Sequence, residues 1–111
     1  MMRFNGNEYS CSMELTLDVI GGKWKTIIIW KLGEKRMRFN ELKRTMPNIT
    51  QKMLTQQLRA LEEDKLINRT VYDQVPPKVE YSLTDDGKSL MPILKELSKW
   101  AIDYSSRMNG V

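Results

Sequence analysis

The sequence contains no histidine and a single cysteine, Cys11, among its 111 residues. Without histidine, neither a Ser-His-Asp triad nor histidine-based acid–base catalysis is available. One cysteine cannot form an intrachain disulfide, and one cysteine without histidine lacks the usual ligand set of a transition-metal site. These absences argue against an enzyme or a metalloprotein, and they fit a chain that works in the reducing cytoplasm.

The sequence also lacks a long apolar run. Its longest aliphatic and aromatic stretch covers residues 27–30, which is far too short to span a bilayer. The N-terminus has one early arginine and no apolar stretch of signal-peptide length, so nothing in it predicts export. Hydrophobic residues make up 41% and charged residues 29%, ordinary values for one globular domain. We therefore expect a single cytoplasmic domain with no cofactor and no membrane partner.

Positive charge is concentrated in one third of the chain. Residues 23–59 hold ten basic and two acidic side chains, a net of +8. The remainder holds eight basic and twelve acidic side chains, a net of −4. Such a concentration is typical of a surface that binds phosphate groups. A basic surface that serves only solubility is the alternative.

The segment after Pro47 predicts a helix over residues 50–63 with two unlike faces. Four apolar residues recur at helical spacing: Met53, Leu54, Leu58 and Leu61. The opposite face is polar and carries no carboxylate before Glu62. Amide, hydroxyl and cationic groups are the ones that read base edges and hold phosphates. We therefore predict a DNA-recognition helix that uses these residues: Thr50, Gln51, Lys52, Thr55, Gln56 and Arg59.

The neighbouring segments complete a winged helix-turn-helix pattern. Asn40 looks like the N-cap of a short helix that ends near residue 46, and a turn of about four residues joins it to the helix that Thr50 would cap. After residue 65 the apolar period changes from helical to alternating, which predicts a β-hairpin, the wing, at about 67–83. Candidate phosphate contacts in these parts, with a merely solvated surface as the alternative, are Arg38, Asn40, Lys43, Arg69 and Lys78.

The N-terminal ten residues are expected to be flexible, whereas two helices near the ends of the domain are expected to form a dimer. Residues 1–10 are expected to form a flexible arm, and residues 11–111 the single domain. A short helix at 13–20 and a long one at about 85–108 are more apolar than a small core can cover, and Pro92 should kink or split the long helix. We expect both helices to pair with a second copy of the chain. The predicted dimer contacts are Leu17, Ile20, Leu94, Leu97, Trp100, Ala101 and Tyr104.

Several motifs occur along the chain in one order. They are Cys11-Ser12-Met13-Glu14, Gly21-Gly22-Lys23-Trp24-Lys25, Arg38-Phe39-Asn40-Glu41-Leu42, Ile49-Thr50-Gln51-Lys52-Met53-Leu54-Thr55, Val75-Pro76-Pro77-Lys78-Val79-Glu80-Tyr81 and Leu83-Thr84. Together they resemble the HxlR-type winged helix-turn-helix regulators, relatives of the MarR group, from about residue 11 to 102. The resemblance implies a bacterial homodimer with an α+β, mainly helical, fold and a dimer built by its terminal helices. It also implies that helix 50–63 enters the major groove and the wing lies near the adjacent minor groove.

The resemblance also bears on Cys11. In some members of the family a cysteine at this place senses electrophiles or oxidants, by forming an adduct or an intersubunit disulfide. A thiol just before a helix N-terminus lies at the positive end of the helix dipole, which favours the thiolate. The alternative is that Cys11 is a small apolar residue at the dimer interface. A small-molecule or electrophile effector therefore remains an open prediction.

The sequence as a whole predicts a sequence-specific transcriptional regulator that binds double-stranded DNA as a homodimer. Repression through a near-palindromic operator is the expected mode of action. A winged-helix module that binds only protein is the alternative, and the net charge of +8 in residues 23–59 argues against it. An enzyme is the third option, but the sequence supplies no catalytic constellation.

Overall fold

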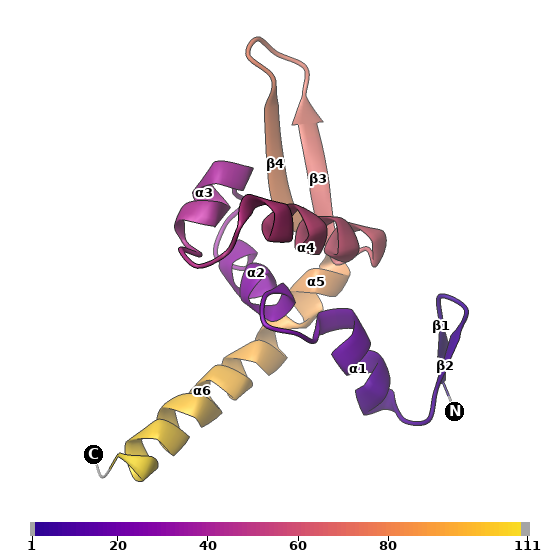
Figure 1. Cartoon of the computed structure of the whole chain (residues 1–111), viewed down its shortest axis with the longest axis vertical. Helices are drawn as coiled ribbons and strands as arrows, with labels where there is room; N and C mark the ends of the chain where they lie inside the picture. Colours follow the sequence, from indigo (N-terminus) through magenta and orange to yellow (C-terminus); the bar gives the residue numbers. More distant parts are fainter. Residues whose placement is uncertain (1, 110–111) are drawn as a thin grey trace.

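The computed structural model describes residues 2–109 and shows a mainly helical α+β fold, as predicted (Figure 1). Its helices are α1 (Ser12–Ile20), α2 (Lys25–Leu32), α3 (Phe39–Arg44), α4 (Gln51–Glu63), α5 (Asp85–Ser89) and α6 (Met91–Met108). Its strands are β1 (Met2–Phe4), β2 (Asn7–Tyr9), β3 (Ile67–Tyr72) and β4 (Lys78–Leu83). Within residues 2–109, no helix combines the length and apolarity needed to cross a bilayer.

Helices α3 and α4 form the predicted helix-turn-helix. The Thr50 hydroxyl accepts a hydrogen bond of 3.0 Å from the Met53 N–H, so Thr50 caps α4 as expected. The predicted cap Asn40 is wrong, because α3 begins one residue earlier and Asn40 lies in its first turn. Arg38 occupies the N-cap position instead, and its N–H donates to the Glu41 carboxylate at 3.0 Å. The reach of the Glu41 side chain therefore sets where α3 starts.

The core lies where α2 and α4 meet the wing. The apolar stripe of α4 is buried at Leu54, Leu58 and Leu61, whereas Met53 stays partly exposed. The side chains most fully buried across the domain are Ile28, Ile29, Leu42, Leu54, Leu58, Leu61 and Ile67. Burying each of these contributes about 1.5–3 kcal/mol to folding. This core fixes the orientation of α4, so that its opposite face points outward.

The wing is a two-stranded antiparallel hairpin at the predicted place. Its register pairs Ile67 with Leu83 at the base and Tyr72 with Lys78 near the tip. Met37, just before α3, joins the hairpin through two backbone hydrogen bonds with Tyr81, of 3.0 and 2.8 Å. Figure 1 shows the hairpin projecting well beyond the helices. The backbone between α2 and α3 is therefore tied directly to the wing.

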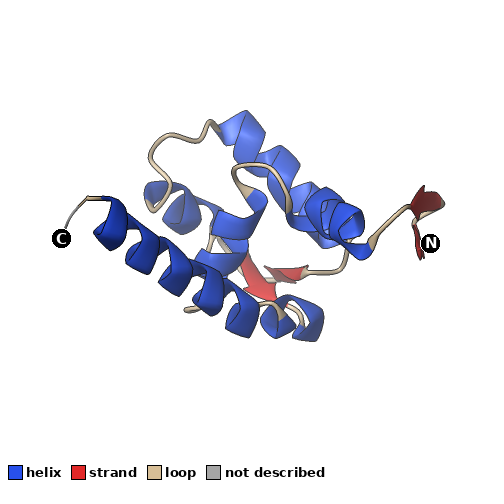
Figure 2. Cartoon of the chain, turned by 90° about the horizontal axis from the view of Figure 1, so that it is seen from below, coloured by secondary structure: helices blue, strands red, loops and turns tan. Residues whose placement is uncertain are grey.

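The long C-terminal helix is split near Pro92, as predicted. Helix α5 ends at Ser89, and Pro92 lies in the first turn of α6, where its missing N–H is tolerated. One predicted dimer contact is wrong: Leu94 is only 3% exposed and belongs to the core of the single chain. Helix α6 contacts α2, and Leu94 belongs to the same buried cluster as Ile28, Ile29 and Leu32 of α2. Figure 1 shows the C-terminal half of α6 extending past the other helices, and Figure 2 shows the whole helix running along one edge of the molecule.

The N-terminal segment differs from the expected flexible arm. Strands β1 and β2 pair in a small antiparallel hairpin, with Met2 opposite Tyr9 and Phe4 opposite Asn7. Asn5 and Gly6 both have positive φ, 50° and 79°, which is the conformation that a two-residue hairpin turn requires. Tyr9 is 8% exposed, and its hydroxyl donates a hydrogen bond to Asp18 of α1. This contact fixes the hairpin on α1.

Candidate nucleic-acid interface

The outward face of α4, made of Gln51, Lys52, Thr55, Gln56 and Arg59, carries most of the residues predicted to contact DNA. All of them are exposed except Thr55, which is half-buried. The Thr55 hydroxyl donates to the Gln51 carbonyl oxygen at 2.9 Å, so its methyl group is the part left for an outside contact. Thr50 is also exposed, but its hydroxyl already caps the helix. The side chains free to reach outward are thus two amides and two cations.

A groove between α3 and the wing is lined by three cationic side chains and by the carboxylates of Glu41 and Glu80, which offset part of their charge. Arg38 and Asn40, two of the predicted phosphate contacts, line it together with Lys78 of β4. Lys43, the other predicted residue within α3, is half-buried and lies outside this groove. Arg44 also lines the groove, although the sequence had not singled it out. The position of Arg44 at this groove depends on the packing of α3 against β4, a contact between segments far apart in sequence.

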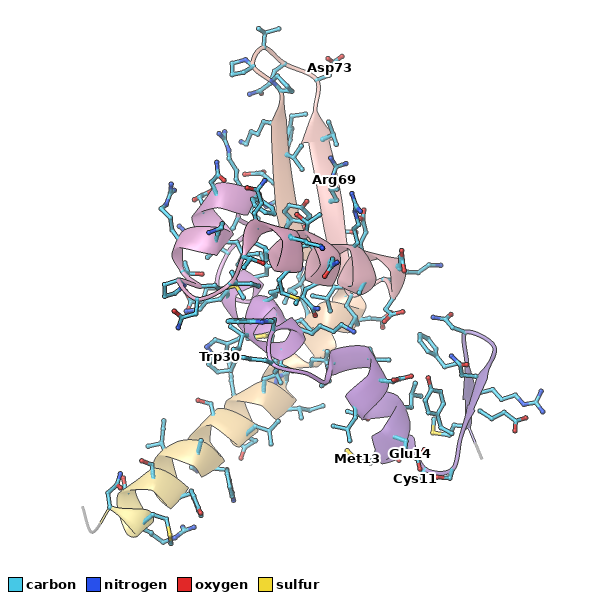
Figure 3. All side chains as sticks on the ribbon, viewed as in Figure 1. Cys11, Met13, Glu14, Trp30, Arg69 and Asp73 are labelled. Atoms are coloured by element: carbon cyan, nitrogen blue, oxygen red, sulfur yellow. The ribbon has the colours of Figure 1, made fainter. Side chains whose placement is uncertain are left out.

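A second groove, of about 410 Å³, lies between α4 and the wing. Arg59 of α4 and Arg69 of β3 both line it, although they are ten positions apart in sequence. Figure 3 shows Arg69 on the strand directly above α4. The carboxylate of Glu62 lies at the same groove and offsets part of its positive charge. Two guanidinium groups from different elements at one groove suit a phosphate backbone.

Lys78 differs from the other predicted contacts because it is engaged within the protein. Its side chain is 28% exposed, and its Nζ lies 3.5 Å from Glu80 Oε2 and 4.9 Å above the centre of the Tyr72 ring. A hydrogen bond with the Tyr72 hydroxyl lowers the pKa of the Glu80 carboxyl, and the charges of Lys78 and Arg36 act in the same direction against partial burial. The sequence analysis did not identify Arg36, Tyr72 and Glu80 as neighbours of Lys78. The spacing of two residues between Lys78 and Glu80 was the available signal, because it places both side chains on one face of a strand.

Cys11 is exposed and stands immediately before α1, at its N-cap position. Its Sγ lies 3.9 Å from Glu14 Oε1, and the Ser10 hydroxyl donates to the same carboxylate oxygen. Figure 3 shows Cys11 and Glu14 at the end of α1 that lies away from the wing. Cys11 is therefore accessible, but far from the α4 face.

The remaining predicted dimer contacts are accessible to a partner. Leu17, Leu97, Trp100, Ala101 and Tyr104 are exposed, and Ile20 is half-buried. The rings of Trp100 and Tyr104 stack with centroids 4.9 Å apart. Further exposed apolar side chains on the same two helices are Met13, Ile93, Ile102 and Met108. An apolar surface of this extent on a small protein marks an interaction site.

Among residues 2–109, no group of three or more Cys, Asp or Glu side chains could hold a metal ion.

A family model described as HxlR-like helix-turn-helix matches residues 19–109. The chain belongs to the HxlR family. The resemblance carried by the motifs is thus confirmed, and membership makes the chain a helix-turn-helix transcriptional regulator rather than an enzyme.

Three relatives place the chain within the HxlR family. The uncharacterized HTH-type transcriptional regulator YtcD of Bacillus subtilis (strain 168) is 57% identical over 103 residues, or 93% of this chain and 82% of YtcD. An HTH-type transcriptional regulator of Methanothermobacter thermautotrophicus is 51% identical over 104 residues, 94% of this chain and 79% of the relative, so the group extends to archaea. The redox regulator HypR, in its oxidized form, superposes with a TM-score of 0.80 at 54% identity, covering 84% of this chain and 96% of HypR.

Proposed function

We propose that this chain is a sequence-specific DNA-binding regulator that acts as a homodimeric repressor on a near-palindromic operator. The observation that carries the proposal is the outward face of α4, which is exposed, polar and without a carboxylate before Glu62. The groove that Arg69 lines includes Thr55 and Arg59 of this face, and Arg38 and Arg44 line a separate groove between α3 and the wing. Because the apolar side of α4 is held in the core, the amide and cationic groups on its other side face outward together.

The residues of α4 divide into two roles in this proposal. Gln51 and Gln56 carry amides that can pair with an adenine edge through two hydrogen bonds, and the methyl group of Thr55 can contact thymine. Lys52 and Arg59 provide charge for phosphates at the rim of the groove. We propose Arg38, Asn40, Lys43, Arg69 and Lys78 as further phosphate contacts, which position α4 without reading sequence.

The homodimer is part of the proposal because one such helix reads too few base pairs to find a genomic site. The exposed apolar surface of α1 and α6 supports pairing with a second copy. It includes Leu17, Leu97, Trp100, Ala101 and Tyr104, with Ile20 at its edge. Two α4 helices held by this contact would enter half-sites about one helical turn, roughly 34 Å, apart.

Operator binding at increasing salt concentration tests the proposal. Affinity for DNA from the chain's own promoter region should fall steeply with salt, because binding releases the counterions of each neutralised phosphate. The substitution Gln56→Ala should reduce discrimination between operator and unrelated DNA more than it reduces unspecific affinity. Gln57→Ala is the matched control, since the Gln57 amide is directed at Met53 within the helix. A flat salt response, or no preference for operator, would contradict the proposal and favour a protein-interaction module.

A response to oxidants through Cys11 is a second proposal, favoured by the exposed thiol at the start of α1. Two Cys11 thiols, one from each subunit, would form one disulfide and transfer two electrons and two protons to an added oxidant such as diamide. Nonreducing electrophoresis should then show a covalent dimer, and operator binding should change in parallel. The variant Cys11→Ser should show neither effect. If this variant responds to oxidant as the unmodified protein does, Cys11 is not the sensor.

A further inference from the structure

Four side chains meet on one face of the wing, although they come from three segments of the chain. Arg36 lies in the loop after α2, Tyr72 on β3, and Lys78 and Glu80 on β4. The Glu80 carboxylate lies 3.5 Å from Lys78 Nζ and 3.9 Å from Arg36 Nη1. Arg36 Nη1 also donates to the Tyr72 hydroxyl at 3.3 Å, and Lys78 Nζ covers the Tyr72 ring. We call these four residues the wing cluster.

The wing cluster is built by the strand register. Lys78 and Glu80 are two positions apart on β4, so their side chains share one face of the hairpin. Tyr72 pairs directly with Lys78, which places its ring on the same face. Arg36 arrives from outside the hairpin, next to the backbone bridge between Met37 and Tyr81. The cluster therefore joins the segment that leads into α3 to both strands of the wing.

Glu80 is the hub of the wing cluster and the one member that DNA would repel. Its side chain is only 15% exposed and faces both cations of the cluster. A carboxylate beside a surface that meets phosphates opposes binding unless nearby positive charge compensates for it. The other three members of the cluster, Arg36, Tyr72 and Lys78, could contact DNA or stabilise the fold in the absence of the Glu80 carboxylate. The position of this carboxylate therefore calls for a role other than contact.

We propose that Glu80 is a positioning residue for DNA binding, which holds Lys78 over Tyr72 and draws Arg36 to the wing. The wing and the α3–α4 pair then meet DNA as one fixed surface. Without this hub the cation of Lys78 samples many rotamers, and the wing loses one of its ties to the segment before α3. The inference rests on the proposed DNA binding and adds a residue whose effect is indirect.

The substitution Glu80→Gln separates positioning from simple electrostatics because the two predict changes in different quantities, operator preference and affinity for DNA of any sequence. Removal of a negative charge alone would strengthen binding to any DNA. Loss of positioning instead lowers the preference for operator over unrelated DNA, because the wing and the α3–α4 pair, which reads the bases, no longer meet DNA as one fixed surface. We expect that preference to fall by about twofold to fivefold, the fold-change typical of a surface ion pair, while unspecific affinity stays equal or rises. An unchanged preference would overturn the inference.

Two controls make the experiment specific. Glu63→Gln removes the same charge from an exposed carboxylate that forms no ion pair within residues 2–109, and it should leave operator preference unchanged. In a Lys78→Gln background, Glu80→Gln should have a much smaller effect, because the two residues act through one contact. Equal effects of Glu80→Gln in both backgrounds would overturn the inference.

A further variant covers the case in which Glu80→Gln does not fold, which circular dichroism would reveal. Tyr72→Phe keeps the ring beneath Lys78 but removes the hydroxyl that bridges Arg36 and Glu80. It should lower operator preference in the same direction by a smaller factor, and an unchanged preference in folded Tyr72→Phe would also count against the inference. If the unmodified protein itself shows no operator preference, the proposed function fails together with this inference. Normal binding by the unmodified protein, with no change in folded variants, rejects only the role of Glu80.

Discussion

Gly87 lies so close to Leu66 that a Cβ atom at position 87 would stand 2.2 Å from the Leu66 carbonyl oxygen. The same carbonyl accepts a hydrogen bond of 3.1 Å from the Thr84 N–H, and the Thr84 hydroxyl donates to the Lys65 carbonyl at 2.7 Å. The start of α5 is therefore docked on the turn that ends α4. Through this contact the C-terminal helices are held in a fixed relation to the face proposed to read DNA.

Replacing Gly87 by alanine should destabilise the protein. The new methyl group would press against backbone, which moves less easily than a side chain, and overpacking of this kind costs about 1–3 kcal/mol. Denaturant unfolding at fixed protein concentration would measure the loss. Lys88→Ala is the matched control, because Lys88 is exposed on the same helix and should change stability little. Equal stability of Gly87→Ala and Lys88→Ala would show that the close approach does not matter.

Leu94 and Leu97 are separated by one helical turn of α6 but should have different roles. Leu94→Ala removes a side chain from the core and should cost about 2–5 kcal/mol of unfolding free energy. Leu97 is 56% exposed in the single chain, so Leu97→Ala should weaken association of two copies instead. Sedimentation at several concentrations, together with thermal unfolding of each variant, would separate the two effects.

The outcome for Leu97 bears directly on the proposed dimer. Because association stabilises the folded state by mass action, the Tm of the unmodified protein should rise with concentration. Leu97→Ala should reduce that dependence, and Lys99→Ala, an exposed change on the same helix, should preserve it. A dimer that is unaffected by Leu97→Ala would place the interface elsewhere on the chain.

Lys52 should act as a phosphate ligand rather than a reader of bases. Lys52→Gln should weaken binding to operator and to unrelated DNA by similar factors, because a phosphate contact carries no sequence information. The slope of log affinity against log salt should become shallower by about one. Filter binding at four salt concentrations would measure it. A selective loss of operator binding would instead show that Lys52 reads a base.

Much of the fold could be predicted from local patterns, since the period of apolar residues changes where α4 gives way to the wing. The N-terminal hairpin was missed although Asn5-Gly6 is a strong signal for a two-residue turn. It was missed because a short polar segment also fits a flexible arm. The burial of Leu94 could not be predicted, because an apolar stripe on a helix does not reveal which of its residues the rest of the chain covers.

The candidate site also has a part that could be predicted from the sequence and a part that could not. The residues of α4 follow from helical spacing alone, so their shared exposure was predictable. The meeting of Arg36 with Glu80 depends on the hairpin register and on the path of the loop before α3, which are tertiary features. Arg44 likewise reaches the wing groove only because α3 packs beside β4. Contacts between segments distant in sequence were therefore the part that sequence reasoning missed.

The hydrogen bond from Tyr9 to Asp18 predicts a pH dependence at alkaline pH. This bond, with partial burial and the charge of Asp18 acting in the same direction, raises the pKa of Tyr9 above its usual value of 10.0. Since the pKa is higher in the folded state, the contribution to stability is complete below about pH 10 and is lost as pH rises through the folded value. The protection of the amides in residues 2–9, measured as the exchange rate relative to that of an unfolded peptide at the same pH, should therefore fall above that pH. In Tyr9→Phe the hairpin should exchange faster at neutral pH and show a flatter alkaline response, whereas an identical profile in both proteins would mean that this hydrogen bond does not hold the hairpin on α1.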